Sequence, residues 1–271
     1  MDGGDSLGTS KKGLSPLHQA VINRCPEEVD RLLKNGAQDR PDVWGITAKE
    51  LSRLLDQKNA LNPPLAKEIL IYRNSDEKVH PLPLAELEER LKMTYTDSLI
   101  FDSLKTIHQV AKKCARKLHK EKFRQMNHWT LALHEEELEK KREHLFYIRW
   151  INRYLGYGVF AARDIPSLTY IGEYTGIVQK RRNRKNRFND YVFSYDLCGK
   201  STRWCIDAQE KGNFTRFLNH SDKPNLTSRW LIRNGITHII FYSNKRIKKG
   251  TQLTYCYGPL YWHRRSSPAL L

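Results

Sequence analysis

The pattern of apolar residues changes near Ile148 from helical spacing to short strand-like runs, and this change constrains the fold more than any other feature. Between Leu84 and Leu155 the chain contains neither Gly nor Pro, and apolar residues recur at helical spacing among charges of both signs. After Ile148, short β-branched and aromatic runs alternate with Gly, Asn and Pro. The runs are Val159–Phe160, Thr169–Ile171, Tyr191–Phe193, Trp204–Ile206, Ile236–Tyr242 and Leu253–Tyr255. The sequence therefore predicts an α+β fold with a helical N-terminal part and a β-rich C-terminal part.

The two halves of the chain also differ in charge. Residues 1–140 contain 23 basic and 22 acidic residues, whereas residues 141–271 contain 24 and 8, so their net charges are +1 and +16. Net charge governs encounters with charged partners, so we expect the second half to attract polyanions. Its densest basic run is Lys180–Arg187. This run has three possible interpretations: a solvated loop, a nuclear-import signal or a nucleic-acid contact.

Several protein classes can be set aside from composition. The mean hydropathy is −0.68, and the sequence has no apolar run of the ~18 or more residues that a membrane helix requires. Residues 1–12 lack the apolar core of a secretory signal, and we expect them to be disordered. The five cysteines form no C-x-x-C pair, so we expect reduced thiols and no bound metal.

The first part of the chain resembles an ankyrin repeat. The segment from Gly13 reads G-L-S-P-L-H-Q-A-V and is followed by a leucine pair and N-G-A, and a degraded second copy runs from Gly45 to about Arg73. We therefore expect ankyrin-like repeats over residues 13–80 and a helical linker over residues 81–144. An unrelated helical hairpin remains the alternative. In the linker we expect four large side chains to pack inside, namely Met93, Phe123, Met126 and Trp129.

Four segments of the second half resemble, in order, the SET domain of protein lysine methyltransferases. They are Gly156–Ala161 with Tyr170–Gly176; Asp190–Phe193 with Ile206–Ala208; Gly212–Ser221 with Pro224 and Asn225; and Ile247–Gly258 with Tyr261 and Trp262. The third, which includes R-F-L-N-H-S-D-K-P-N, is the most specific. The resemblance spans Leu155–Trp262, and we expect a SET domain over residues 145–263 and a tail over residues 264–271.

The resemblance implies a knot-like threading of the C-terminal portion and the activity of an S-adenosylmethionine-dependent protein lysine N-methyltransferase. Methyl transfer to an amine is an in-line displacement, which needs aligned reactants and a neutral amine. A narrow, dry channel lined by tyrosines meets both needs. The resemblance assigns this catalytic role to Tyr257, Tyr191 and Tyr255.

The resemblance also implies which residues bind the cofactor. These are Gly156, Tyr157, Gly158, Tyr191, Arg216, Asn219, His220 and Tyr257. Asn219 and His220 could instead satisfy a buried loop. We expect Tyr261 or Trp262 to cover the adenine.

Departures from the family pattern bear on the substrate. Thr251, Gln252 and Cys256 stand where family members carry carboxylates, so the rim of the site is less acidic than usual. We favour a histone or a histone-like DNA-bound protein, presented by nucleic acid docked on Lys180–Arg187; a substrate without a basic tail is the alternative. The hydroxyl of Tyr255 restricts room for the amine, which favours mono- or dimethylation.

Ankyrin-like repeats joined to a SET domain without cysteine-rich flanks resemble effectors that intracellular bacteria deliver into host cells. That resemblance implies a protein partner for the ankyrin-like segment, no membrane contact, and the host nucleus as the destination; otherwise we expect cytoplasm or nucleoid. Two competing functions are a catalytically weak SET-like adaptor that binds chromatin or nucleic acid and a purely nucleic-acid-binding protein.

Overall fold

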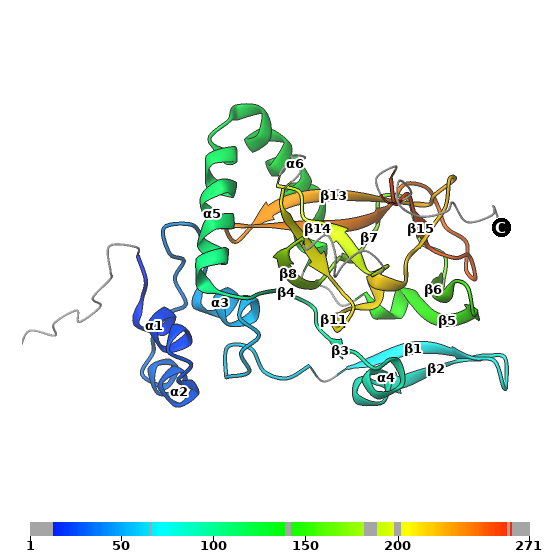
Figure 1. The fold of residues 1–271 in the computed structure, drawn as a ribbon, viewed down its shortest axis with the longest axis horizontal. Coiled ribbons are helices and arrows are strands. Elements are labelled where there is room, and N and C mark those ends of the chain that lie inside the picture. Colours follow the sequence, from blue (N-terminus) through cyan, green and yellow to red (C-terminus); the bar gives the residue numbers. More distant parts are fainter. Residues whose placement is uncertain are drawn as a thin grey trace, which may run out of the picture.

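A computed structural model describes most of the chain. The described residues are 13–65, 67–138, 142–181, 189–197, 202–258 and 261. Three short helices lie at one end of the molecule, a long helix pair stands beside them, and a β-rich body fills the other end (Figure 1). The expected disordered N-terminus, the C-terminal tail and the positions from 182 to 187 of the basic run lie outside the described residues.

The first two helices form a helix pair, which both the ankyrin resemblance and the unrelated helical hairpin predict. They are α1 (Pro16–Ile22) and α2 (Pro26–Lys34). Ser15 caps α1, and its backbone N–H donates to Nδ1 of His18 at 3.2 Å. Since Nδ1 accepts, Nε2 carries the proton and donates to the carbonyl of Ile46 at 3.0 Å. The buried His18 therefore ties α1 to the segment that leads into α3 (Ala48–Leu54).

The second predicted repeat is wrong beyond α3. Its last residues enter β1 (Glu68–Arg73), which pairs with β2 (Lys78–Pro83) as an antiparallel hairpin. Ile69 and Ile71 are fully buried with less buried neighbours between and beside them, and this two-residue alternation suits a strand rather than a helix. The described part of residues 13–80 thus holds one helix pair, a third helix and a hairpin.

The predicted helical linker contains helices interrupted by strands. After α4 (Leu84–Leu91) come β3 (Thr94–Tyr95) and β4 (Leu99–Phe101), and only then α5 (Leu104–Leu118) and α6 (Glu121–Leu138). The expectation that Leu99 belongs to a helix is wrong because all three residues of β4 are buried and pair with a neighbouring strand. Helix α5 begins after Ser103, whose side chain accepts from the backbone of Thr106.

Two of the four side chains expected to pack inside are exposed. Met93 is buried and Phe123 packs against the core, but Met126 and Trp129 are 41% and 69% exposed. Helix α6 turns a polar side inward instead. The side-chain amide of Asn127 donates to the carbonyl of Ile232 at 2.9 Å and accepts from its N–H at 2.6 Å, so this helix satisfies the backbone of a strand edge.

The C-terminal half consists of short strands, and each of the six predicted β-runs overlaps one of them. The elements are η1 (Glu143–Leu145), β5 (Phe146–Asn152), β6 (Gly156–Ala161), β7 (Tyr170–Glu173), β8 (Gly176–Lys180), β9 (Val192–Ser194), β10 (Trp204–Asp207), β11 (Lys211–Gly212), η2 (Phe214–Phe217), β12 (Asn219–His220), β13 (Leu226–Arg233), β14 (Ile236–Ser243) and β15 (Thr254–Tyr255). The sheets have the strand orders β2-β1-β5-β6, β4-β8-β10-β9 and β13-β14-β7, with two-stranded pairs β11-β3 and β12-β15.

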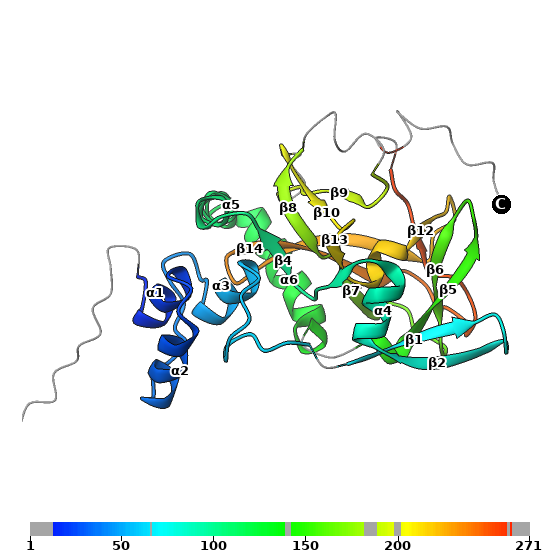
Figure 2. The ribbon, with the colours of Figure 1, turned by 60° about the horizontal axis from the view of Figure 1, so that its bottom comes forward.

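Strands from the N-terminal half complete the sheets of the C-terminal half. Strand β1 pairs in parallel with β5, β3 with β11, and β4 with β8. Figure 2 shows the β1–β2 hairpin beside β5 and β6. Strands of the N-terminal half therefore support the second half together with its helices.

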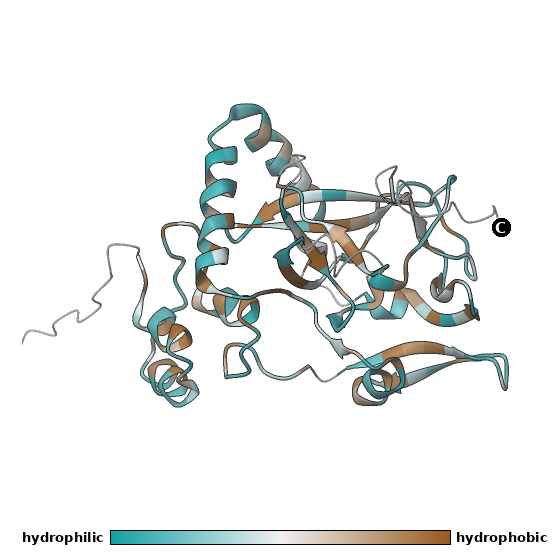
Figure 3. Cartoon of the chain, in the orientation of Figure 1, coloured by the Kyte–Doolittle hydropathy of each residue, from teal (hydrophilic) through white to brown (hydrophobic). Residues whose placement is uncertain are grey.

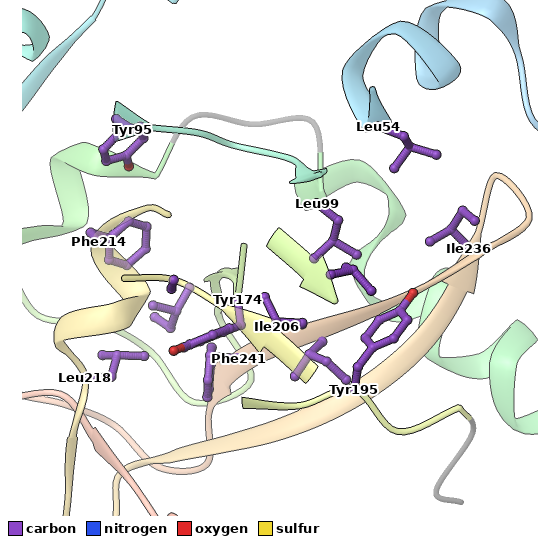
Figure 4. Close-up of a cluster of buried hydrophobic side chains, with 14 of the residues drawn as sticks. Leu54, Tyr95, Leu99, Tyr174, Tyr195, Ile206, Phe214, Leu218, Ile236 and Phe241 are labelled. Carbon is purple, nitrogen blue, oxygen red and sulfur yellow. The ribbon is translucent and has the colours of Figure 1, made fainter. Parts of the chain in front are cut away.

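One apolar core joins the two halves. Its buried residues run from Leu17 in α1 to Tyr255 in β15. Figure 4 shows Leu54 of α3 and Leu99 of β4 near Ile236 and Tyr195 in this cluster. The hydroxyl of the fully buried Tyr195 donates to the carbonyl of Thr237 at 2.7 Å. Among the described residues, no helix is long and apolar enough to span a bilayer.

Candidate active site

Two short strands bring the two most specific sequence motifs together. Strand β12 runs parallel to β15, with Asn219 opposite Thr254 and His220 opposite Tyr255. Asn225 fixes this junction, because its side-chain amide donates to the carbonyl of Gln252 at 2.7 Å and accepts from the N–H of Thr254 at 2.9 Å. We refer to the β12–β15 pair as the strand junction. The knot-like threading itself stays a prediction.

The glycine motif of β6 reaches the same junction. The side-chain amide of Asn219 donates to the carbonyl of Tyr157 at 3.2 Å. Gly156 has a φ of +67°, a conformation that favours glycine. At Gly158 an added Cβ would lie 2.7 Å from Cδ1 of Ile151, so a larger residue would force its neighbours apart. The local geometry therefore favours glycine at both positions.

Tyr255 and Tyr257 form the centre of the cluster. Their ring centroids are 4.8 Å apart, and the Tyr257 ring lies 5.4 Å from that of His220. The hydroxyl of Tyr257 donates to the carbonyl of Leu218 at 2.8 Å, and its N–H donates to Nδ1 of His220 at 3.2 Å. Burial raises the pKa of both tyrosines well above the ordinary value, so both are neutral phenols at physiological pH.

Tyr191 and Arg216 form a second part of the cluster. The guanidinium of Arg216 lies 3.8 Å from the Tyr191 ring centroid, and the Phe217 ring lies between the rings of Tyr191 and Tyr157 at 6.4 and 5.6 Å. Burial lowers the pKa of Arg216, which nevertheless remains a cation. Its Nη1 donates to the carbonyl of Gln209, whereas its buried Nε has no hydrogen-bond partner among the described residues.

Tyr261 covers one side of the tyrosine pair. Its ring packs edge-on against Tyr257 at 4.6 Å, and its hydroxyl donates to Asp190 at 3.2 Å. Trp262, the other residue expected to cover an adenine, lies outside the described residues. Every candidate catalytic and cofactor-binding residue from the sequence is therefore part of one continuous cluster around the strand junction.

The candidate catalytic and cofactor-binding residues of this cluster lie in a part of the chain that is similar to known proteins. Residues 156–258 match the SET domain. The histone-lysine N-methyltransferase MEDEA of Arabidopsis thaliana is 35% identical over 119 residues, which cover 42% of this chain and 17% of that protein. The histone-lysine N-methyltransferase SETD2 of Homo sapiens is 36% identical over 107 residues, which cover 38% of this chain and 4% of that protein. The chain thus spans less than a fifth of either relative.

Among solved structures, the chain is similar to the crystal structure of Arabidopsis thaliana SUVH6 in complex with SAM. The identity is 28%, the match covers 42% of this chain and 27% of that one, and the TM-score is 0.37. We refer to residues 156–258 as the SET region.

The SET region also contains site residues that sequence reasoning missed. Tyr255 stacks on Phe193 at 5.9 Å and meets Phe241 edge-on at 4.9 Å. The hydroxyl of the buried Tyr174 donates to the carbonyl of Tyr191 at 2.8 Å, and Figure 4 shows its ring beside Phe241. All three belong to or adjoin the β-runs found in the sequence. The density of aromatic residues in those runs was the available signal.

A separate hollow of about 690 Å³ lies between the loop after α3 and strand β7. It is lined by polar and charged side chains, including Lys67, Glu143, Glu173 and His238, and by none of the candidate catalytic tyrosines. Nζ of Lys67 lies 2.7 Å from Glu143, and Nδ1 of His238 lies 2.8 Å from Glu173. No group of three metal-binding side chains occurs among the described residues.

Proposed function

We propose that this protein is an S-adenosylmethionine-dependent protein lysine N-methyltransferase. The observation that carries the proposal is the strand junction, which gathers Tyr157, Asn219, His220 and Tyr257 from three separate motifs around one point. The match of residues 156–258 to the SET domain and the names of the two curated relatives support it.

The residues around the junction fit S-adenosylmethionine. The buried Nε of Arg216 has no hydrogen-bond partner among the described residues, and it suits a carboxylate oxygen. When bound, the cofactor would supply an electrophilic methyl group on a sulfonium. The residues that would hold it are Gly156, Tyr157, Gly158, Tyr191, Arg216, Asn219, His220 and Tyr257.

Tyr257, Tyr191 and Tyr255 would line the lysine channel. A lysine amine among these buried rings loses its hydration, which lowers its pKa from ~10.4 and favours the neutral nucleophile. Because Tyr255 and Tyr257 are neutral phenols, their oxygens can accept hydrogen bonds from the amine and orient its lone pair. The side chains thus contribute alignment and exclusion of water rather than a strong base.

The hydroxyl of Tyr255 would also limit the number of methyl groups added. Tyr255 is 9% exposed and held between Phe193 and Phe241, so its ring has little freedom to move aside for a bulkier amine. Mono- and dimethylation are therefore favoured over trimethylation.

The substrate class that fits the charge is a histone or a histone-like DNA-bound protein. Cys256 is exposed beside the tyrosines and carries no charge that would attract a basic tail, so attraction would come through nucleic acid instead. The proposal has three extensions. Nucleic acid would dock on Lys180–Arg187, and helices α1–α3 would bind a protein partner. The protein would act as a bacterial effector in the host nucleus.

The test is methyl transfer from isotopically labelled S-adenosylmethionine. The wild-type protein, Tyr257→Phe and the control Tyr154→Phe are each incubated with core histones, with nucleosomes and with bacterial DNA-binding proteins. Tyr154 is 79% exposed and lies outside the cluster, so its variant removes a hydroxyl at no cost to the site. We expect label in one pool, a loss of ~100-fold or more in Tyr257→Phe, and a rate within twofold of wild type in Tyr154→Phe.

Two outcomes would contradict the proposal. Equal transfer by Tyr257→Phe and the wild type would remove Tyr257 from the reaction. Absence of both cofactor binding and transfer would favour the catalytically weak adaptor instead.

A further inference from the structure

A groove of about 770 Å³ lies between helix α5 and the ends of strands β8 and β10. Its lining contains five cations and no acidic residue. They are Lys112, Lys113, Arg116, Lys180 and Arg203. We call this feature the α5 groove. It shares no residue with the tyrosine cluster or with the hollow beside β7.

The cations come from parts of the chain that the sequence does not connect. Gln109, Lys112, Lys113 and Arg116 follow the three- and four-residue spacing of one helix face, so α5 presents them along one side of the groove. Figure 3 shows much of α5 coloured hydrophilic. Strand β4 belongs to the same sheet as β8 and β10, and α5 is the next element after β4 in the chain. This connection places the cationic face of α5 against Lys180 and Arg203.

The cations face solvent rather than carboxylates. All five are exposed, and no ion pair to an acidic side chain is recorded for any of them among the described residues. Lys113 instead lies over the ring of Trp204 at 4.5 Å. Five like charges in one concave surface raise the local positive potential, because each adds to the field of the others.

The groove fits a phosphate backbone better than the bases of a single strand. Proteins that bind single strands stack the bases on exposed aromatic rings. In the described lining the aromatic residue is Trp204, which is 6% exposed and has Lys113 over its ring. With no ring face open for stacking, the cations can contact phosphates but the groove cannot hold an unstacked base.

We propose that the α5 groove binds the phosphate backbone of double-stranded DNA. The partner is set by charge complementarity, since the described lining carries positive charge without a carboxylate and offers no open ring for base stacking. Binding of this kind is independent of sequence and weakens steeply with salt, because each phosphate contact releases a bound counterion. The inference does not depend on methyl transfer or on the cofactor.

The experiment measures anisotropy of a fluorescent 20-base-pair duplex with the full chain, without cofactor, at several salt concentrations. The groove variant is Lys112→Glu with Arg116→Glu. The matched control is Lys248→Glu with Lys249→Glu, which makes the same change in net charge at two exposed residues after β14. We expect the groove variant to bind at least ~10-fold more weakly, with a salt slope smaller by about 2, and the control to stay within threefold of wild type.

A second variant guards against misfolding. Lys112→Gln with Arg116→Gln removes the charge but keeps polar side chains on the exposed face, and its circular dichroism should match that of the wild type. Weakening of duplex binding in this variant supports the groove. Equal weakening in the groove and control variants, or no weakening in either, would overturn it. Tighter binding of a single strand, of duplex RNA or of polyglutamate than of duplex DNA would overturn the choice of partner.

Discussion

The SET region and the segment that supports it, residues 67–118, are built on different principles. In the SET region, polar side chains such as Asn219 and Asn225 bond to the backbone of strands that come from other motifs. In the supporting segment, the short strands β1, β3 and β4 add to existing sheets through backbone pairing and apolar burial. Specific polar contacts leave a motif in the sequence. The addition of an apolar strand leaves almost no sequence motif, because many different sequences can pair with a sheet edge.

Asn219 and Asn225 of the third motif offer the sharpest test of this difference. Asn219 makes one recorded hydrogen bond and faces the proposed cofactor site, whereas Asn225 is buried and makes two bonds that hold the strand junction. We expect Asn219→Ala to lower methyl transfer by ~100-fold or more with a stability loss of about 1 kcal/mol. Asn225→Ala should instead lower the free energy of unfolding by ~2–4 kcal/mol.

Denaturant unfolding and labelled transfer, measured on both asparagine variants, separate these effects. The comparison fails if Asn219→Ala unfolds as readily as Asn225→Ala, since Asn219 would then be a structural residue like its neighbour.

The contact between the N-terminal helices and the body can be tested at two glycines. Gly235 and Gly250 have φ values of +73° and +80°, so alanine is strained at both. An added Cβ at Gly235 would also overlap the carbonyl oxygen of Trp44, whereas at Gly250 it meets nothing within 4 Å. We expect Gly250→Ala to lower the free energy of unfolding by about 1 kcal/mol and Gly235→Ala to lower it by ~2–4 kcal/mol. Equal losses in thermal unfolding would show that Trp44 is not docked on this turn.

A partly buried ion pair between His238 and Glu173 predicts a pH dependence. Burial lowers the pKa of His238, but the carboxylate of Glu173, with a smaller effect from Glu50 of α3, outweighs burial and raises it above the ordinary value of 6.5. Because the folded protein holds this proton more tightly, the stabilisation is complete below pH 6.5 and is lost as the pH rises through the raised pKa.

Between pH 6 and pH 9 we therefore expect the free energy of unfolding to fall by about 1 kcal/mol more in the wild type than in His238→Gln. Thermal unfolding followed over this range measures the difference. Parallel pH profiles for the two proteins would refute the linkage.

The smallest effect concerns the product. Removing the Tyr255 hydroxyl in Tyr255→Phe should raise the proportion of more highly methylated product a few-fold while leaving the first methyl transfer nearly unchanged. Intact-mass analysis resolves the methyl states. A dominant +42 species in the wild type, confirmed not to be acetylation, would contradict the role given to Tyr255.

The sequence predicted the site better than the scaffold around it. The tyrosines, Asn219 and Arg216 lie together because separate motifs contact one another, as in the hydrogen bond from Asn219 to the carbonyl of Tyr157. Strand β4 could not be predicted, since Leu99–Phe101 is too short to show a period and becomes a strand only when β8 is present.

Helix α6 also shows a limit of prediction from sequence, because its hydropathy pattern indicated the wrong buried face. Its apolar residues Met126 and Trp129 indicated a buried face, but Asn127 faces inward because the backbone of β13 needs hydrogen-bond partners. A pattern of hydropathy does not reveal such a need, which arises only in the assembled sheet. The α5 groove escaped prediction for a similar reason: its cations come from both halves of the chain, and only the fold brings Lys112, Lys113 and Arg116 beside Lys180 and Arg203.

The most direct test of the central claim is a crystal structure of the protein with S-adenosylhomocysteine. The account predicts electron density for the ligand beside Gly158, Asn219 and His220, with its sulfur directed toward Tyr257. Density in the 690 Å³ hollow beside Glu173 and His238, with the strand junction empty, would contradict it.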